Sequence, residues 1–413
     1  MNDQNQTRPE LLVPAGDSRR LRTAIRFKAD AVYLGGTAFG MRSAPENFDD
    51  AQLEAAVALA HANGVKVYLT VNVLPRSGEL PALPRFLAHA ASCNVDALIV
   101  SDLGVLEYAK QYAPGVPLHI STQMGVVNYA AANALYRLGA RRIVTARELS
   151  LKELKVMRAN IPQDLELECF IHGAMCVSFS GRCLLSNYLA GRDSNRGDCA
   201  QPCRWTYNLV EEKRPGQFFP IEDRDGATYI LNAKDLCMIE HLPELIDAGI
   251  NSFKIEGRAK SEYYVAVVTN AYRKALDGYF AAPSPDYRPE QWVADELTKI
   301  SYRDYCTGFF FGDPRETANI SFRGGYNRLW DVMAIVERSE HGRVFCTQRN
   351  RFFAGDTLEV LTPDAVPFTV TADDLQNADG EPIDATSHPM MPFSFACDVP
   401  LAPETILRKA RDD

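Results

Sequence analysis

The sequence lacks the segments that would send a chain out of the cytoplasm or into a bilayer. Its first ten residues, MNDQNQTRPE, are polar and have neither the charged nor the apolar region of a signal peptide. No apolar run reaches the length of a membrane span. We therefore expect a cytoplasmic location, where thiols stay reduced. The 413 residues, 46% hydrophobic and 23% charged, suffice for a large core and a second domain.

Several enzyme motifs are also missing. The chain has no H-E-x-x-H, no G-x-S-x-G and no G-x-G-x-x-G that opens a helix after the first strand. These absences argue against a zinc peptidase, a serine hydrolase and an open doubly wound sheet. The net charge of −9 argues against nucleic-acid binding as a bulk property, although it does not exclude a local basic patch.

Cysteine, in contrast, is concentrated in one polar segment. Cys176, Cys183, Cys199 and Cys203 have the spacing C-x6-C-x15-C-x3-C among Gly, Ser, Asn, Asp and Arg. Four reduced thiols within 28 residues indicate a metal site rather than disulfides. The six-residue gap between Cys176 and Cys183 is too long for the usual pair of zinc-binding cysteines, which are separated by about two to four residues. The spacing therefore favours an iron–sulfur cluster, and structural zinc remains the alternative. Cys237 is a spare candidate ligand.

Most of the chain alternates between short apolar runs and amphipathic stretches. Eight such runs, most followed by a helical pattern, predict a parallel sheet closed into a (β/α)8 TIM-like barrel over residues 1–281. The cysteine-rich loop 174–207 would be an insertion after the seventh strand, at the barrel mouth. The expected strands are residues 10–16, 31–36, 66–72, 97–102, 117–122, 142–148, 165–173 and 252–258.

The pattern changes near the C-terminus. Residues 282–329 contain a proline-rich stretch and predict a linker and docking segment. Within it, the aromatic and basic residues 301–312 suit either stacking on unpaired bases or a strap between domains. Residues 330–413 show two-residue alternation broken by turns, which predicts a small all-β barrel. There Arg349, Asn350 and Arg351 are candidates for RNA contact or simply exposed polar residues.

Polar residues follow the ends of the expected barrel strands, where sites in this fold are built. The catalytic candidates are His172, Lys254 and Glu256. Lys254 and Glu256 are two residues apart on one strand, so they share a face and could form an ion pair lining the barrel. His172 could be a proton donor, a partner of the cluster or a hydrogen-bonded core histidine. The substrate-binding candidates are Arg42, Arg147, Arg258, Asn72 and Gln123.

The segment E-x-F-x2-G-A-M-C-x4-G-x-C-x-L-S, from Glu168 to Ser186, resembles the signature of the collagenase-like peptidases, the unclassified peptidase family numbered thirty-two. Its extension NRGDCAQPCRW-x-Y, from Asn195 to Tyr207, is similar to the branch of that family that makes 5-hydroxyuridine at the wobble position of tRNA. Further matching stretches are ELLVPAG, ADAVYLGG, FKIEGR and RNRFFAGDTLEV.

The resemblance implies a tRNA uridine hydroxylase that works without oxygen. It implies a 4Fe–4S cluster on the four cysteines, prephenate as the hydroxyl donor and the tRNA anticodon arm as partner, and it leaves open a homodimer or a paralogue partner. A dicarboxylate such as prephenate would need Arg42, Arg147, Lys254 or Arg258, because a guanidinium can hold a carboxylate with two parallel hydrogen bonds.

Three other functions remain open. One is a peptidase, as the family label suggests. Another is a non-catalytic RNA-binding protein with a four-cysteine structural zinc. A third is hydroxylation of a different substrate, as in the quinone-pathway relatives. The resemblance implies that those relatives lack the C-terminal β domain, so its presence here favours tRNA.

Overall fold

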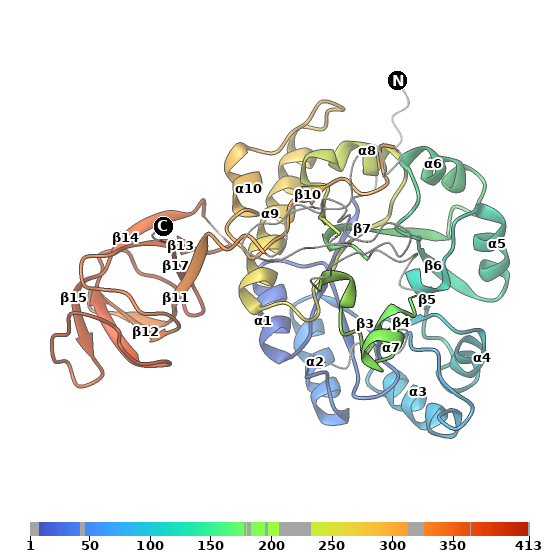
Figure 1. Ribbon diagram of the computed structural model, residues 1–413, viewed down its shortest axis with the longest axis horizontal. Helices are drawn as coiled ribbons and strands as arrows, with labels where there is room; N and C mark the ends of the chain where they lie inside the picture. The colour runs from blue at the N-terminus through green and yellow to red at the C-terminus, as the bar shows by residue number, and fades with distance from the viewer. Residues whose placement is uncertain are drawn as a thin grey trace, which may run out of the picture. The chain divides into compact units, whose positions relative to one another are not determined.

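The computed structural model describes residues 8–41, 46–176, 179, 183–194, 197–205, 233–312, 326–363 and 365–411. The chain divides into two compact units, one formed by Met1–Ala294 with Arg303–Tyr326 and the other by Asp295–Tyr302 with Asn327–Asp413 (Figure 1). The expected docking segment 282–329 is therefore shared between the two units. None of the helices in the described ranges is long and apolar enough to cross a membrane.

Eight parallel strands of the first unit form a closed barrel (Figure 1). Each strand pairs with the next along the chain, and the last strand pairs with both the first and the seventh. This confirms the predicted barrel and all eight expected strands. They are β1 (Glu10–Pro14), β2 (Ala31–Gly35), β3 (Lys66–Val71), β4 (Ala97–Val100), β5 (Leu118–Ile120), β6 (Ala140–Val144), β7 (Glu166–Ala174) and β9 (Ser252–Ile255).

The surrounding helices begin where side-chain caps accept backbone N–H groups. Asp49 and Ser150 form full capping boxes, and Asp17, Asp102 and Asn128 also cap helix starts. Because capping residues such as Asp, Asn and Ser can be recognised in the sequence, the starts of these helices are predictable from it. The helices are α1 (Ser18–Arg26), α2 (Asp50–Ala62), α3 (Leu83–Ser92), α4 (Leu103–Tyr112), α5 (Tyr129–Arg137), α6 (Leu151–Ala159), α7 (Leu185–Ala190), α8 (Leu242–Asp247), α9 (Glu262–Ala281) and α10 (Gln291–Glu296).

Two short strands extend the barrel sheet beyond β7. Strand β8 (Asp235–Cys237) runs antiparallel to β7, and β10 (Tyr305–Cys306) runs parallel to β8. The buried Arg303 donates to Asp235 through Nε at 3.0 Å and Nη2 at 2.6 Å, which fixes β10 to β8. Within the segment 301–312, Tyr305 and Cys306 thus add a strand to the barrel unit, and Arg303 is not available to stack on bases.

The barrel interior holds a network of buried charges. Arg142 donates to Glu10 at 2.7 Å and to Glu168 at 3.1 Å, and Lys254 donates to Glu168 at 2.7 Å. Burial alone would raise the pKa of the Glu10 carboxyl, but Arg142 lowers it below its usual range. The expected Lys254–Glu256 pair is wrong. Glu256 lies beyond the end of β9, where the alternation of faces along a strand no longer applies.

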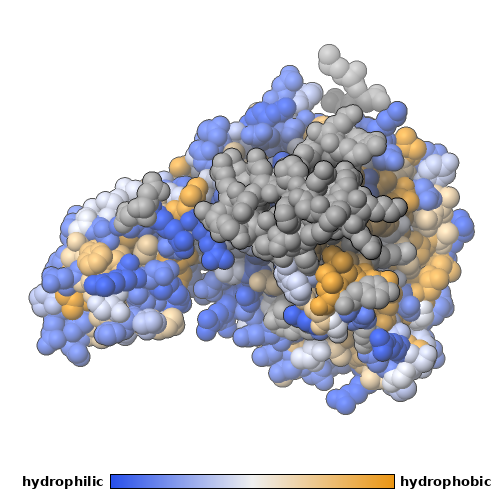
Figure 2. Space-filling model, in the orientation of Figure 1, coloured by the Kyte–Doolittle hydropathy of each residue, from blue (hydrophilic) through white to orange (hydrophobic). Residues whose placement is uncertain are grey.

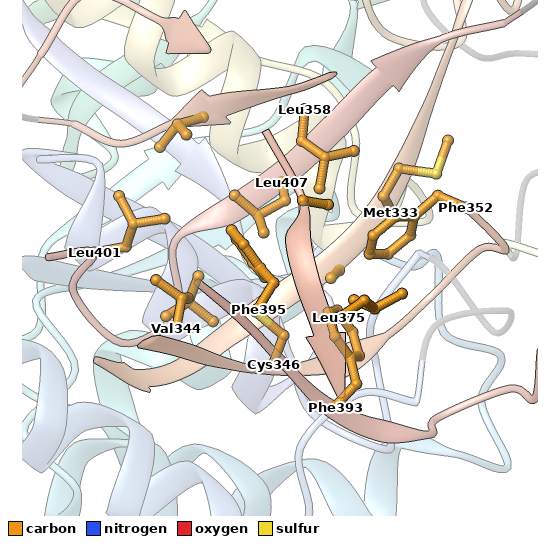
Figure 3. Close-up of a cluster of buried hydrophobic side chains, with 14 residues drawn as sticks. Met333, Val344, Cys346, Phe352, Leu358, Leu375, Phe393, Phe395, Leu401 and Leu407 are labelled. Carbon is orange, nitrogen blue, oxygen red and sulfur yellow. The ribbon is translucent and has the colours of Figure 1, made fainter. Parts of the chain in front are cut away.

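The second unit is a seven-stranded antiparallel sheet in the order β14-β13-β17-β11-β12-β16-β15. Its inner face packs around Phe352, Phe393 and Phe395 (Figure 3). Among the described residues its two end strands do not pair with each other, so it is a half-barrel rather than a closed barrel. The strands are β11 (Trp330–Glu340), β12 (Arg343–Gln348), β13 (Thr357–Leu361), β14 (Phe368–Thr371), β15 (Asp373–Asn377), β16 (Pro392–Ala396) and β17 (Ile406–Ala410).

Replacing Glu168 with Gln should destabilise the barrel strongly, because Lys254 would keep a buried charge without its carboxylate. We expect the free energy of unfolding to fall by about 3–5 kcal/mol. Glu107→Gln is the matched control, since Glu107 pairs with Lys110 on an exposed helix face and its loss should cost at most about 1 kcal/mol. Urea unfolding followed by circular dichroism measures both. Equal effects would show that the buried network does not stabilise the fold.

Candidate functional site at the barrel mouth

The carboxyl ends of the barrel strands carry a set of interlinked polar groups. Asn72, just after β3, accepts from the Met41 amide at 3.2 Å and lies 3.4 Å from the Ser121 hydroxyl after β5. Ser101, after β4, donates to the Asn72 carbonyl at 2.7 Å. Gln123 follows in the short 3-10 helix η2 (Thr122–Met124). The structure therefore brings Asn72 and Gln123 to the same rim of the barrel, and their substrate-binding role stays a prediction.

Arg258 crosses this rim and is almost fully buried, at 3% exposure. Its guanidinium donates to the Thr70 hydroxyl at 2.8 Å and to the Asn47 side chain at 2.9 Å. It also lies over Gly35, where a Cβ atom would come within 2.7 Å of Nη2. Glycine is thus required at the end of β2 to leave room for this cation.

Arg147, which follows β6, is held by three contacts. Its guanidinium lies 4.0 Å from the centre of the Phe170 ring, and it donates to Glu256 and to the Ala174 carbonyl, each at 3.2 Å. The ammonium of Lys254 lies 5.5 Å from the same ring. Phe170 therefore links the rim arginine to the buried charge network, and Glu256 orients Arg147 rather than pairing with Lys254.

His172 does not point into this group of side chains. It is 1% exposed and lies among the rings of Tyr264, Tyr272 and Tyr305, with Nδ1 3.4 Å from the Tyr272 hydroxyl. Burial lowers the pKa of His172 to about 3, so the imidazole is neutral near pH 7. Of the three roles considered for His172, its surroundings favour the hydrogen-bonded core histidine.

The cysteine-rich segment leaves the barrel directly after β7. Cys176 and Cys199 are exposed, Cys183 and Cys203 are half-buried, and none of the ten cysteines, all described, forms a disulfide. Hydrogen bonds from Ser194 to the Cys183 carbonyl and from the Ala200 amide to Ser186 connect the parts that carry Cys183 and Cys199. Helix α7 also packs against the 3-10 helix η5 (Pro202–Arg204), which contains Cys203.

The donor chemistry of these cysteines fits an iron–sulfur cluster. The Leu185 amide lies 3.3 Å from the Cys183 sulfur, and the Gln201 amide lies 3.3 Å from the Cys199 sulfur. Such N–H donors stabilise thiolates and tune cluster potentials. In the described part of the chain no three His, Cys, Asp or Glu side chains are arranged to hold a metal ion, so the cluster stays a prediction. Burial raises the pKa of Cys237 to about 12, which makes it a poor spare ligand.

An open cleft of about 790 Å³ separates the loop after β3 from the cysteine-rich segment. Its volume is in the range of small-molecule sites. It is lined by Arg76, Gly78, Glu79, Asn187, Gly191, Asp193 and Asp198. None of these residues was predicted, because loop residues far apart in sequence give no shared pattern.

Other residues of the rim also went unpredicted. Phe170 could have been found, because it lies two residues after Glu168 on β7 and so faces the same side. Thr70 and Asn47 carry no sequence signal for contact with Arg258. Arg42 lies outside the described residues.

Two family models together cover almost the whole chain. Residues 16–320 match Peptidase family U32, and residues 328–408 match the Peptidase family U32 C-terminal domain. The chain belongs to peptidase family U32. Both the barrel unit and the half-barrel unit of this U32 chain are thus accounted for by family modules.

Relatives of this U32 chain carry names that refer to RNA modification. "tRNA hydroxylation protein P1" of Bacillus subtilis is 37% identical over 98% of this chain and 95% of its own length. "tRNA hydroxylation protein P" of Escherichia coli is 33% identical over 91% of this chain and 90% of its own length. "23S rRNA 5-hydroxycytidine C2501 synthase" of Escherichia coli is 41% identical over 74% of this chain, which covers 46% of that protein.

Burial of His172 should make stability depend on pH. The unfolded imidazole takes up a proton below about pH 6.5, whereas the folded one resists protonation until about pH 3, so stability falls as the pH drops through this window. Between pH 7 and pH 5 this group should contribute a loss of about 2 kcal/mol. The stability advantage of the wild type over His172→Asn should shrink by that amount in urea unfolding. A difference that does not vary with pH would contradict the neutral buried state.

Proposed function

We propose that this protein is an RNA-modifying enzyme that hydroxylates the wobble uridine of tRNA to 5-hydroxyuridine. The observation that carries the proposal is the end-to-end similarity, across both family modules, to two proteins named for tRNA hydroxylation. The relative named as an rRNA 5-hydroxycytidine synthase supports the same reaction type, hydroxylation of a pyrimidine base at C5.

Prephenate is the proposed hydroxyl donor, and the barrel mouth offers cationic groups for its two carboxylates. Arg147 follows β6 and Arg258 follows β9, and hydrogen bonds to protein oxygens hold both guanidinium groups in place. Fixed guanidinium groups lose little side-chain entropy when they bind an anion. Asn72 and Gln123 lie on the same rim and supply neutral donors and acceptors for the hydroxyl group of such a ligand.

The four cysteines would hold a 4Fe–4S cluster through Cys176, Cys183, Cys199 and Cys203. When bound, such a cluster supplies one-electron redox chemistry, and the reaction would proceed without oxygen. The protein's own contribution is to orient the donor's carboxylates with Arg147 and Arg258. Glu256 acts on the donor through its contact with Arg147, so it is a positioning residue.

A peptidase is the alternative that the family name suggests. A cysteine–histidine contact does occur, with the Cys93 sulfur 3.5 Å from Nε2 of His89. It lies at the end of α3, and burial together with nearby acidic groups raises the pKa of Cys93, which opposes thiolate formation. This contact therefore lacks the activated nucleophile that a cysteine peptidase requires.

Gly35→Ala should impair hydroxylation while leaving the protein folded. The new methyl group would displace the flexible end of Arg258, and misplacing a substrate-binding group should reduce formation of 5-hydroxyuridine by about 10-fold or more. Mass spectrometry of tRNA nucleosides from a host without its own activity measures this. Gly312→Ala is the control, since a Cβ there meets nothing within 4 Å. Unchanged modification in Gly35→Ala would remove Arg258 from the proposed site.

Anaerobic purification with iron and sulfide analysis tests the cofactor. We expect brown protein with about four irons per chain, and Cys183→Ser should lose them. Cys397→Ser in the second unit should keep the iron, because Cys397 lies outside the cysteine-rich segment. Colourless protein with one zinc ion would contradict the cluster and favour a structural clamp.

A further inference from the structure

The second unit has an excess of acidic residues, and most of its basic side chains are neutralised by them. The face of this unit visible in Figure 2 is mostly hydrophilic. Its basic residues that form ion pairs with carboxylates are Lys299, Arg338, Arg343, Arg408, Lys409 and Arg411. Positive charge available to a partner must therefore come from basic residues outside this set.

Arg349 and Arg351 differ from that set. Neither forms an ion pair with a carboxylate of the described residues. Arg349 contacts the Met390 sulfur at 3.0 Å, and the Arg351 guanidinium lies 4.9 Å from the centre of the Phe353 ring. The loop between β12 and β13 thus carries two cations that form no ion pair within the described part of the chain.

The same loop exposes apolar surface next to these cations. Phe353 is 50% exposed and Met390 is 55% exposed, whereas the adjacent Phe352 is buried in the core (Figure 3). Phe353 lies outside the hydrophobic core of this unit, and half of its surface stays in water. An exposed ring flanked by arginines is the combination that single-stranded nucleic acid uses, with bases on the ring and phosphates on the cations.

Hydrogen bonds hold this loop in one conformation. The Arg349 amide donates to the Met333 carbonyl at 2.8 Å, and the Phe353 amide donates to the Asp356 carboxylate at 2.9 Å. The Ala354 amide donates to the Asp384 carbonyl at 2.9 Å. The ring and the two guanidinium groups are thus presented from a fixed backbone, which lowers the entropic cost of binding.

We propose that the Arg349–Phe353 loop, together with Met390, is a binding site for unpaired nucleotides of the RNA substrate. One base stacks on Phe353, and Arg349 and Arg351 contact the flanking phosphates. The site rests on the proposed function for the identity of the RNA, a tRNA with an unpaired loop. A purely apolar protein partner fits less well, because it would leave both cations without a counter-charge.

The test measures the affinity of the full chain for a tRNA transcript and for an oligouridylate of about 12 nucleotides, by fluorescence anisotropy at about 50–200 mM salt. Phe353→Ala should weaken both affinities about 10-fold, and Phe353→Trp should keep them. The double variant Arg349→Ala/Arg351→Ala should reduce the slope of log K against log salt by about 1.4, as expected for the loss of two phosphate contacts on a single strand.

Arg338→Ala is the matched control. Arg338 also stacks on a phenylalanine, Phe345, at 3.9 Å, but it is already paired with Glu340. Its loss should change neither the affinity nor the salt slope. Wild-type RNA affinity in Phe353→Ala would overturn the site, and so would an equal loss of affinity in Arg338→Ala. Reduced tRNA modification by Phe353→Ala with unchanged RNA affinity would also overturn it and would indicate a protein-docking surface.

The binding assay needs neither turnover nor a cofactor, so the two proposals can fail separately. Ring-dependent RNA binding without formation of 5-hydroxyuridine would contradict the hydroxylase and leave the loop site standing. Formation of 5-hydroxyuridine with ring-independent RNA binding would do the reverse.

Discussion

The buried charges inside the barrel are the constraint on which the rest of the first unit depends. Transferring Glu168, Arg142 and Lys254 out of water costs several kcal/mol per ion. The attraction between the opposite charges offsets this cost only when their geometry is good. Good geometry requires β6, β7 and β9 to keep the register that places Arg142 opposite Glu166, and Glu168 opposite Ser252. A slip of one residue would turn each charge to the outer face of the barrel. The network therefore makes the strand register a condition of stability.

The same network fixes the floor of the candidate site. Phe170 faces the barrel two residues beyond Glu168, where it meets the Lys254 ammonium, and it also supports the Arg147 guanidinium. Arg258 is fixed differently, through neutral oxygens of Thr70 and Asn47 and through the absence of a side chain at Gly35. Arg147 and Arg258 are thus oriented on one rim by different sets of contacts. The dicarboxylate proposed above would meet guanidinium groups that protein contacts already orient.

Local patterns in the sequence predicted the barrel well, because each strand is an apolar run and the helices that follow begin at side-chain caps. Strands β8 and β10 escaped prediction because they span only three and two residues and depend on Arg303 and Asp235, which are 68 residues apart. The wrong partner for Lys254 has a similar origin. Alternation along one strand pointed to Glu256, whereas the actual partner comes from β7, which becomes a neighbour only when the barrel closes. Contacts made by closure of a sheet leave no local pattern.

The pairing of β6 with β7 also ties the start of the cysteine-rich segment to the barrel. Arg147 donates to the carbonyl of Ala174, the last residue of β7 and only two positions before Cys176. The rim arginine thus binds the backbone from which the first predicted ligand departs, while its other side-chain donor holds Glu256. One short stretch of β7 therefore links the predicted cluster to the rim arginine, and the buried charges hold the register of that strand.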